Sequence, residues 1–367
     1  MKRLLCIVSA MNTGGAETFL MKIYRGLDKE KYQMDFCVNS NENFYAEEIK
    51  KLGGKIYVIP SKSQNIIKFF NLLKGVVSYN KYNYVLRVNQ HSLSVIDLLA
   101  AKSGGAKHLI MRSSNASSGC RAKEFLHKTF QFLPKSIPDI KLAPSKLAAE
   151  YTFGKKQVEN GQVTILNNGL DIKLFKFNNE IREKYRKELN IEDKFVIGHI
   201  GRFNEQKNHN FLIQIFNEIK KKQDNAVLLL IGQGELENKV MQQVYEYGLD
   251  DSVMFLGVRK DIPNLLFSMD SFLFPSFFEG MPNTVIEAQT TGLPCLISNS
   301  ITAEAEVTKL VHFEALNKSA DEWAEALLNI SKEKVFLNRE CAAEQMKEKG
   351  YDINDCIKKF EKIVFED

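Results

Sequence analysis

The six cysteines of this 367-residue chain are scattered, and no two of them form a C-x-x-C pair. This argues against a structural zinc site and a disulfide scaffold, and it fits a reducing cytoplasm. No window reaches the ~18–20 continuous apolar residues of a membrane span. The apolar run after Met1 is short and leads directly into a polar glycine loop, which favours a first strand over a signal peptide. A soluble or peripheral protein is therefore expected.

The composition is mixed, with 44% hydrophobic and 26% charged residues, which excludes disorder and suffices for a packed core in two domains. The charge is uneven. Residues 1–190 hold 31 Lys and Arg against 16 Asp and Glu, whereas residues 191–367 hold 19 against 29. A basic half joined to an acidic half indicates that the two halves meet different partners.

Short apolar runs alternate with helical patterns in two successive series, which predicts parallel sheets. The expected strands are 4–8, 36–39, 56–59, 84–88, 108–111 and 140–143, then 195–200, 227–231, 253–256, 271–275 and 294–298. We expect an α/β protein with Rossmann-like domains at 1–175 and 190–349 that face a cleft. The charged segment 176–194 is expected to connect them. An apolar stripe within 350–367 predicts a final amphipathic helix.

Two loops are candidates for binding an anion. Gly14 and Gly15 follow the first strand, where backbone can approach a ligand and a helix N-terminus can add its amides. The alternative is a tight turn that needs positive φ. Arg202 and Lys207 follow the first strand of the second series, at the edge where open α/β sheets bind ligands. Two cations in one loop suit a diphosphate, the alternative being a solvated basic loop.

The segment FFEGMPNTVIEAQTTGLP (277–294) carries the strongest signal. Glu279 precedes a predicted helix and Glu287 lies in its early turns, while the stretch between them exposes amides at the helix N-terminus. A pair of carboxylates is also what the active site of a glycosidase uses, so a glycosidase is the alternative. Arg202, Lys207 and the amides favour a phosphate-bearing ligand instead.

Together these motifs resemble those of family 4 glycosyltransferases of the GT-B fold. The resemblance rests on E-G-x-P-x-x-x-x-E at 279–287, G-R-x-x-x-x-K at 201–207 and G-V-R-x-D-I at 257–262. NTGGAE at 12–17 and NGLD at 168–171 match the family's glycine loop and interdomain turn, so the likeness spans nearly the whole chain. Residues 195–302 are particularly similar to bacterial capsular and exopolysaccharide transferases. The family also implies that the final helix crosses back onto the first domain.

The resemblance implies a role for each matching residue. Arg202 and Lys207 would bind the donor diphosphate, and Glu279 would contact hydroxyls of the transferred sugar; these three form the expected catalytic set. Glu287 would hold the ribose, and Gly15 would let its loop reach the phosphates. The full set expected to bind the donor is Gly14, Gly15, Val258, Arg259, Gly280, Met281, Pro282, Asn283, Thr284 and Glu287.

The sequence departs from the family in one loop. Many relatives carry histidines after the fourth N-domain strand, whereas residues 110–115 contain none here. His91 in the preceding loop is a possible substitute, although a lone loop histidine is often only solvated. Arg112 and Asn115 join it as candidates on the acceptor side.

The expected activity is retaining transfer of a sugar from a nucleotide-sugar, with uridine as the expected base and guanosine as the alternative. The acceptor would be a lipid-diphosphate-linked saccharide in capsule, exopolysaccharide or O-antigen biosynthesis. No D-x-D occurs, so neither a metal nor another cofactor is expected. A nucleotide-sugar epimerase or hydrolase of the same fold is the alternative. The lack of G-x-G-x-x-G disfavours a dehydrogenase, and the lack of an aromatic–basic motif disfavours a nucleic-acid partner.

Two basic amphipathic stretches, 62–82 and 123–141, suit an anionic membrane surface. Core helices with a lysine rim are the alternative for either stretch. With the basic N-terminal half, they predict a cytoplasmic protein that is peripheral at the inner face of the plasma membrane.

Overall fold

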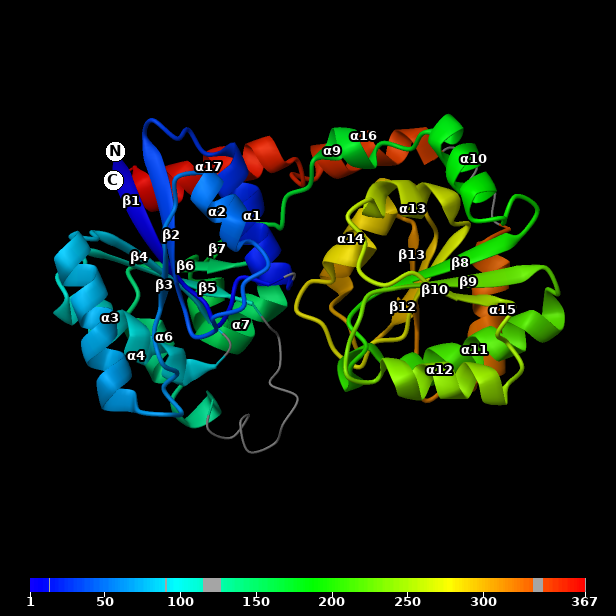
Figure 1. Cartoon of the computed structure of the whole chain (residues 1–367), viewed down its shortest axis with the longest axis horizontal. Helices are drawn as coiled ribbons and strands as arrows, with labels where there is room; N and C mark the ends of the chain where they lie inside the picture. Colours follow the sequence, from blue (N-terminus) through cyan, green and yellow to red (C-terminus); the bar gives the residue numbers. More distant parts are fainter. Residues whose placement is uncertain (13, 90, 115–126, 333–338, 367) are drawn as a thin grey trace. The chain divides into compact units, whose positions relative to one another are not determined.

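The computed structural model describes the whole chain except residues 13, 90, 115–126, 333–338 and 367. The chain forms two compact units, Met1–Gly169 with Asp352–Asp367, and Leu170–Tyr351. Each contains one parallel sheet covered by helices, which confirms the predicted class of two Rossmann-like domains (Figure 1). No described helix is long and apolar enough to cross a membrane.

The sheet of the first unit has the order β3-β2-β1-β4-β5-β6-β7, so its first strand lies inside the sheet. β1 pairs in parallel with β2 on one side and β4 on the other. The strands are β1 (Lys2–Ile7), β2 (Tyr32–Val38), β3 (Ile56–Val58), β4 (Tyr84–Asn89), β5 (His108–Ser113), β6 (Ile140–Ala143) and β7 (Thr164–Ile165). The two-residue β7 was not predicted, because so short a pairing leaves no pattern in the sequence.

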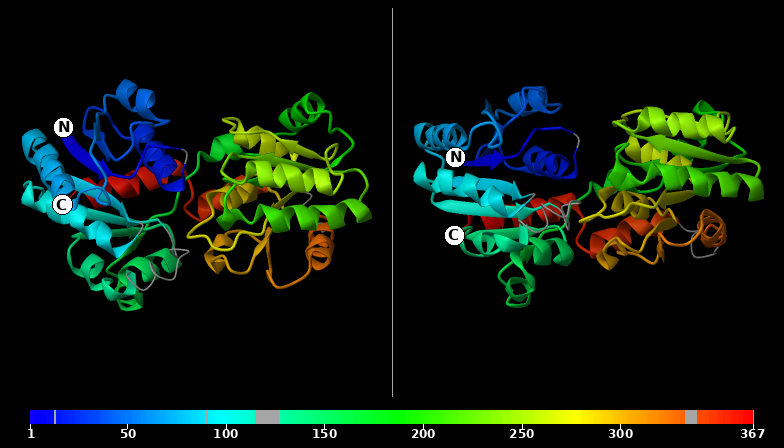
Figure 2. Two further views of the ribbon diagram at one scale, coloured as in Figure 1. Left: turned by 60° about the horizontal axis from the view of Figure 1, so that its bottom comes forward. Right: turned by 90° about the horizontal axis from the view of Figure 1, so that it is seen from below.

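Helices cover both faces of this sheet, and each face has its own apolar core. One face carries α1 (Gly15–Gly26), α2 (Ala46–Lys51) and α17 (Ile353–Phe365) (Figures 1 and 2). The other face carries α3 (Ile66–Asn80), η1 (Ser92–Ser94), α4 (Val95–Ser103), α6 (Phe132–Ser136), α7 (Lys146–Phe153) and α8 (Lys155–Glu159).

The final helix, α17, belongs to the first unit although it follows the second in sequence. It packs against α1, where Phe360 is buried edge-to-face with Phe19. Asp352 caps its start by accepting a hydrogen bond from the Asn354 amide. This confirms that the final helix returns to the first domain, as the resemblance implied, and its apolar side completes the first unit's core.

The second unit has the sheet order β10-β9-β8-β11-β12-β13, again with its first strand inside. β9 is buried along its whole length, as expected of a strand covered on both faces. The strands are β8 (Phe195–Ile200), β9 (Ala226–Ile231), β10 (Val253–Phe255), β11 (Ser271–Phe274), β12 (Cys295–Ser298) and β13 (Val311–Glu314). β13 was not predicted; it is an edge strand of only four residues, most of them half-buried.

Helices of this unit also divide between the two faces of the sheet (Figure 1). One face carries α9 (Ile172–Phe175), α10 (Asn179–Glu188), α13 (Ile262–Ser268), α14 (Asn283–Thr290) and α16 (Ala342–Glu348). The other carries α11 (His209–Lys222), α12 (Glu237–Glu246) and α15 (Ala320–Ile330); short 3₁₀ turns are η2 (Glu205–Lys207), η3 (Ala303–Ala305) and η5 (Arg339–Cys341).

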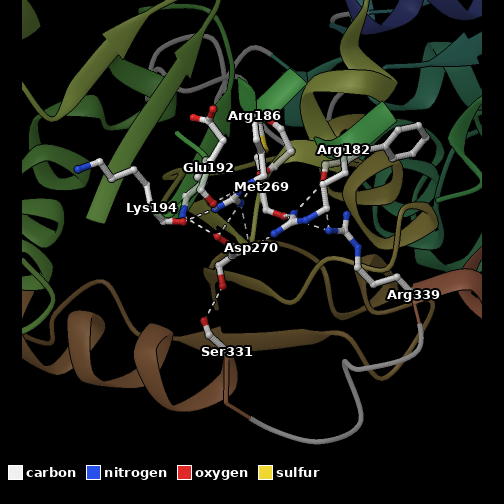
Figure 3. Close-up of polar contacts among 12 residues, drawn as sticks. Arg182, Arg186, Glu192, Lys194, Met269, Asp270, Ser331 and Arg339 are labelled. Atoms are coloured by element: carbon white, nitrogen blue, oxygen red, sulfur yellow. Dashed lines mark hydrogen bonds and ion pairs between the residues drawn. The ribbon is translucent and has the colours of Figure 1, made fainter. Parts of the chain in front are cut away.

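The segment expected to connect the domains is part of the second unit, because α10 packs against α13. Three arginines fix this corner at the amino ends of β8 and β11 (Figure 3). Arg182 donates to the carbonyls of Phe267 and Met269, and pairs with Asp270 at 2.5 Å. Arg186 joins the same Asp270 at 3.2 Å. Arginines thus satisfy the carbonyls at the end of α13 that have no intrahelical partner.

Arg339 completes this cluster from the other side (Figure 3). It donates to the carbonyls of Leu266, Met269 and Thr291 at 2.8 to 3.1 Å, and its guanidinium lies over the Phe177 ring. Burial lowers the pKa of Arg339 to about 9, and the neighbouring Arg182 adds to that effect. The carbonyl dipoles of the α13 C-terminus offset part of this cost of burying a cation.

Candidate active site

The most distinctive point of the second unit is the place where β8 and β11 part. The chain winds one way through β8, β9 and β10 and the other way through β11, β12 and β13, so the strand order reverses between β8 and β11. Their pairing covers only Ile197 with Ser271 and Gly198 with Phe272. Beyond these pairs the carboxyl ends separate, and open α/β sheets bind ligands at such a point.

Lys207 and Glu279 meet at this switch point. The Lys207 ammonium lies 2.6 Å from Glu279 Oε1 and 4.5 Å from the centre of the Phe274 ring. The two side chains are only 16% and 11% exposed. Lys207 comes from the loop after β8 and Glu279 from the loop after β11, as the sequence predicted. The structure thus brings together two of the three expected catalytic residues.

Polar side chains hold the two loops against each other. Asn204 Oδ1 accepts a hydrogen bond from the Lys207 amide, which closes the 3₁₀ turn η2. Gln206 exchanges backbone and side-chain hydrogen bonds with Phe277 and Phe278, and Asn208 donates to the Pro275 carbonyl at 3.1 Å. The position of Lys207 is therefore set by backbone as well as by its partner Glu279.

Two buried histidines lie close to Lys207. His199 donates from Nδ1 to the Leu273 carbonyl at 2.9 Å, and His209 stacks on Phe203 with 4.2 Å between ring centres. Burial lowers the pKa of His209 to about 4 and that of His199 well below 6.5, and the charge of Lys207 lowers both further. Within the described residues, His199 Nε2 and both His209 nitrogens have no hydrogen-bond partner. Both imidazoles are therefore neutral at pH 7 and add no charge beside the Lys207–Glu279 pair.

Arg202 lies at the same edge of the sheet but is placed differently. Its guanidinium is 72% exposed and lies 3.5 Å from Glu235, which follows β9. The loops after β8 and β9 touch backbone to backbone: a Cβ on Gly232, whose φ is +140°, would lie 2.0 Å from the Gly201 carbonyl oxygen. Glu235 was not singled out from the sequence, although the GQG run before it (232–234) signals this close approach.

The start of α14 offers backbone rather than side chains. Pro282 is its N-cap, and within the described chain no side chain caps the helix. Met281 points into the apolar core, so only its backbone can serve a ligand, and Thr284 has a buried hydroxyl with no partner among the described residues. Glu287 is half-buried one turn further along, while Gly280 and Asn283 flank the N-cap. The N-terminus of an eight-residue helix without a side-chain cap is suited to binding an anion.

The predicted base-binding segment follows β10 at the same edge. Val258 is half exposed, whereas Arg259 pairs with Asp261 at 2.6 Å. That hydrogen bond lowers the pKa of Asp261 to about 2, and Tyr185 also donates to Asp261. Arg259 is held by its own loop, so Val258 and the backbone remain as the surface available to a base.

In the first unit, Gly14 is the N-cap of α1 and Gly15 its first residue, at the end of the loop that follows β1. The tight-turn alternative fails for Gly14, because its φ is −71°. A Cβ at Gly14 would lie 2.3 Å from Glu17 Oε2, so a side chain here would displace the Glu17 carboxylate. The Glu17 carboxylate is folded over the loop, and burial raises its pKa. The position expected to reach phosphates thus carries an acidic neighbour that the sequence analysis passed over.

The three candidates for the acceptor side, His91, Arg112 and Asn115, lie in different environments. His91 lies after β4, and burial together with Lys62 and Arg87 lowers its pKa, so it is neutral at pH 7. Arg112 is 1% exposed; it lies over the Phe19 ring and donates to Asn168 Oδ1. Burial lowers its pKa to about 9, and its position indicates a structural role inside the first unit. Asn115 lies outside the described residues.

A buried ion cluster at the switch point of the first unit escaped sequence analysis. Asp97 pairs with both Lys62 and Arg87 at 2.5 and 2.6 Å, and Arg87 also donates to the Ile7 carbonyl. These residues lie far apart in sequence, so no local motif reveals them. No group of three or more potential metal ligands occurs among the described residues.

Comparison with known proteins agrees with this geometry. Residues 181–352 match the family described as glycosyl transferases group 1. EpsF of Bacillus subtilis (strain 168), whose name assigns its glycosyltransferase activity provisionally, is 32% identical over 96% of this chain and 93% of its own length. An Escherichia coli galactosyltransferase acting from UDP-Gal on α-D-GlcNAc-diphosphoundecaprenol is 24% identical over 77% of this chain and 79% of its own.

Solved structures share the fold of the whole chain. Anabaena HepE in complex with UDP gives a TM-score of 0.79 at 18% identity, covering 99% of both chains. The lipopolysaccharide glycosyltransferase WaaG gives 0.76 at 15% identity, covering all of both. The GT-B fold implied by the resemblance is thereby confirmed. Since the B. subtilis relative matches over nearly its full length, the chain belongs to the group 1 glycosyl transferases and is a glycosyltransferase.

Proposed function

We propose that the enzyme transfers a sugar, with retention of anomeric configuration, from a UDP-sugar to a lipid-diphosphate-linked saccharide in surface polysaccharide biosynthesis. The observation that carries the donor half of this proposal is the Lys207–Glu279 pair at the switch point of the second unit. A cation and a carboxylate 2.6 Å apart match the two needs of a sugar diphosphate, a charge for phosphate and an acceptor for hydroxyls.

In the proposed complex, Lys207 and the exposed Arg202 neutralise the diphosphate, and the uncapped start of α14 adds its amides and dipole. Glu279 then accepts hydrogen bonds from the sugar and Glu287 from the ribose. Val258 and nearby backbone lie along the base. HepE was solved with UDP, which supports uridine as that base.

The proposed reaction is front-face transfer. The bond between the anomeric carbon and the phosphate oxygen breaks, and the carbon becomes cation-like. The acceptor hydroxyl attacks from the same side, and its proton passes to the departing phosphate oxygen. The protein supplies positioning and leaving-group stabilisation rather than a dedicated base. The positive charge comes from Lys207, Arg202 and helix amides in this route.

The acceptor half rests on named relatives. The E. coli relative acts on a sugar joined to diphosphoundecaprenol, and a Campylobacter jejuni relative, 24% identical, carries a diphospho-undecaprenol acceptor in its name. We therefore place the reaction at the inner face of the plasma membrane, where a lipid-linked acceptor is held.

The test is turnover of the full chain against UDP- and GDP-sugars, with and without lipid-diphosphate saccharides. The expected result is an acceptor-dependent product from a UDP-sugar with the anomeric configuration retained. Donor consumption that ignores the acceptor would instead establish an epimerase or hydrolase. A product from GDP-sugars alone would overturn the choice of base.

A further inference from the structure

Helix α3 in the first unit leaves apolar side chains exposed. Its inner side buries Phe69, Leu73 and Val77. These residues satisfy the reading of α3 as a core helix, but they leave Ile66 and Ile67, at its first turn, 49% and 72% exposed. The two isoleucines, with Phe70, Asn71 and Ile96, line a shallow groove of about 240 Å³ between α3 and α4.

The stretch of sequence that forms this groove is almost free of acidic residues. Between Glu48 and Glu124 the sequence contains a single acidic residue, Asp97, against 13 lysines and arginines. Asp97 is buried and already pairs with Lys62 and Arg87. The one carboxylate of a 75-residue stretch is therefore consumed inside the unit.

The surface lysines of α3 and α4 consequently have no carboxylate in their own stretch of sequence to pair with. Lys68, Lys74 and Lys102 are exposed, and no ion pair of theirs occurs among the described residues. Cations that keep their charge unpaired beside exposed isoleucines have the pattern of a helix that lies in a membrane interface.

We propose that this α3 surface, formed by Ile66, Ile67, Lys68, Lys74 and Lys102, docks on an anionic lipid bilayer. Ile66 and Ile67 enter the headgroup region, and the three lysines contact lipid phosphates. Charge complementarity selects the occupant, since three exposed lysines without an ion pair among the described residues suit a surface of uniform negative charge. The inference deepens the membrane part of the proposed function by naming the face that carries it.

The experiment is co-sedimentation of the full chain with vesicles containing about 30 mol% phosphatidylglycerol, or none, at low and high salt. The variants are I66N/I67N and K68E/K74E. Wild type is expected to bind only the anionic vesicles and to release at high salt, and each variant to bind at least about tenfold more weakly.

Two matched controls separate the α3 surface from overall charge and hydrophobicity. K358E/K359E makes the same charge change on exposed residues of α17, on the opposite face of the sheet, and M241N/Y245N removes exposed apolar groups from α12. Both are expected to bind like wild type. Equal loss in the controls would overturn the proposal, as would binding that ignores lipid charge. The proposal would also be overturned if the wild type bound no lipid and I66N/I67N instead disrupted a dimer or a complex with an acidic protein.

Transfer to a detergent-dispersed acceptor, measured in parallel, keeps this inference separate from the function. The α3 variants fold and turn over like wild type in that assay if the surface serves docking alone. Vesicle binding without any transfer would leave the docking surface in place and refute the catalytic proposal. Transfer without vesicle binding would support the catalytic proposal and refute the docking surface.

Discussion

At the scale of single residues, the defining feature is that Lys207 and Glu279 neutralise each other before any donor arrives. A diphosphate must compete with the Glu279 carboxylate for the same ammonium. The carboxylate is thus expected to help turnover by holding the sugar and to weaken the binding of phosphate. These two effects have opposite signs in affinity, which makes them separable.

Glu279→Gln is expected to lower turnover about 100-fold while tightening UDP binding, because the competing charge is gone. Lys207→Gln is expected to lower turnover by a similar factor and to weaken UDP binding about tenfold, through loss of a charge-assisted hydrogen bond. Calorimetric titration with UDP and steady-state kinetics check both. Glu218→Gln, which removes the carboxylate of a surface pair with Lys221, is the control. Weaker UDP binding by Glu279→Gln would contradict the competition.

Arg339 makes a second prediction at this scale. Arg339→Met removes the donor for several buried carbonyls, so the free energy of unfolding is expected to fall by about 3 kcal/mol. Lys318→Met removes the exposed partner of Glu314 and should leave the free energy of unfolding nearly unchanged. Urea unfolding of both variants is the measurement. Equal losses would mean that the arginine cluster contributes no more than a surface pair.

The lowered pKa of His209 leads to a prediction for how the stability of the protein depends on pH. Its folded pKa of about 4 lies below the unfolded value of 6.5, so the unfolded chain binds the proton more readily between these values. Stability is complete above about pH 6.5 and falls as pH falls, by about 2 kcal/mol at pH 5 from this residue alone. His209→Phe keeps the ring on Phe203 and should flatten that part of the profile. An unchanged slope in urea midpoints between pH 7 and 5 would refute the assignment.

At the scale of elements, α17 joins the end of the chain to its beginning. Phe360→Ala empties a buried position against Phe19, so it is expected to destabilise the first unit by about 3–5 kcal/mol. Hydrogen exchange should show faster opening of β1 and α1, with β8 and β11 unchanged. Leu174→Ala, at an exposed position of α9, is the control and should change stability by no more than about 0.5 kcal/mol. Equal acceleration in both units would contradict the unit boundaries.

Elements also show how far the sequence alone could lead. Eight of the eleven predicted strands lie within one residue of the observed ends, because buried parallel strands leave apolar runs. β1 starts and β5 ends two residues beyond the prediction, and β2 starts four residues earlier. The motif residues Lys207 and Glu279 were found because each follows such a run. His199 beside Lys207 and Glu17 beside Gly14 were not found, since a histidine inside a strand or an acid in a first helical turn has no local signature. Glu235, which pairs with Arg202, lies in another loop and was not found either. The Asp97 cluster needs three elements to be packed before it exists.

At the scale of the whole molecule, the two units carry separate cores as well as opposite charge. Donor binding should therefore stabilise them unequally. UDP at about 100 times its Kd is expected to add about 2.7 kcal/mol to the unit that holds it. Amides of β8, β9 and β11 should gain protection from hydrogen exchange, and those of β2 and β5 should not. Equal protection of both sheets would contradict a donor site built mainly on the second unit.

The arginine cluster has a consequence for how such an enzyme can diversify. Arg182, Arg186 and Arg339 fasten the amino ends of β8 and β11, while every candidate donor contact in this unit lies at or beyond the carboxyl ends. Folding and specificity thus occupy opposite edges of one sheet. Grafting segments 257–261 and 277–282 from a relative with another donor should then change the accepted nucleotide-sugar without a loss of soluble, folded enzyme. The loops that determine donor specificity can therefore change without disturbing the contacts that hold the domain together.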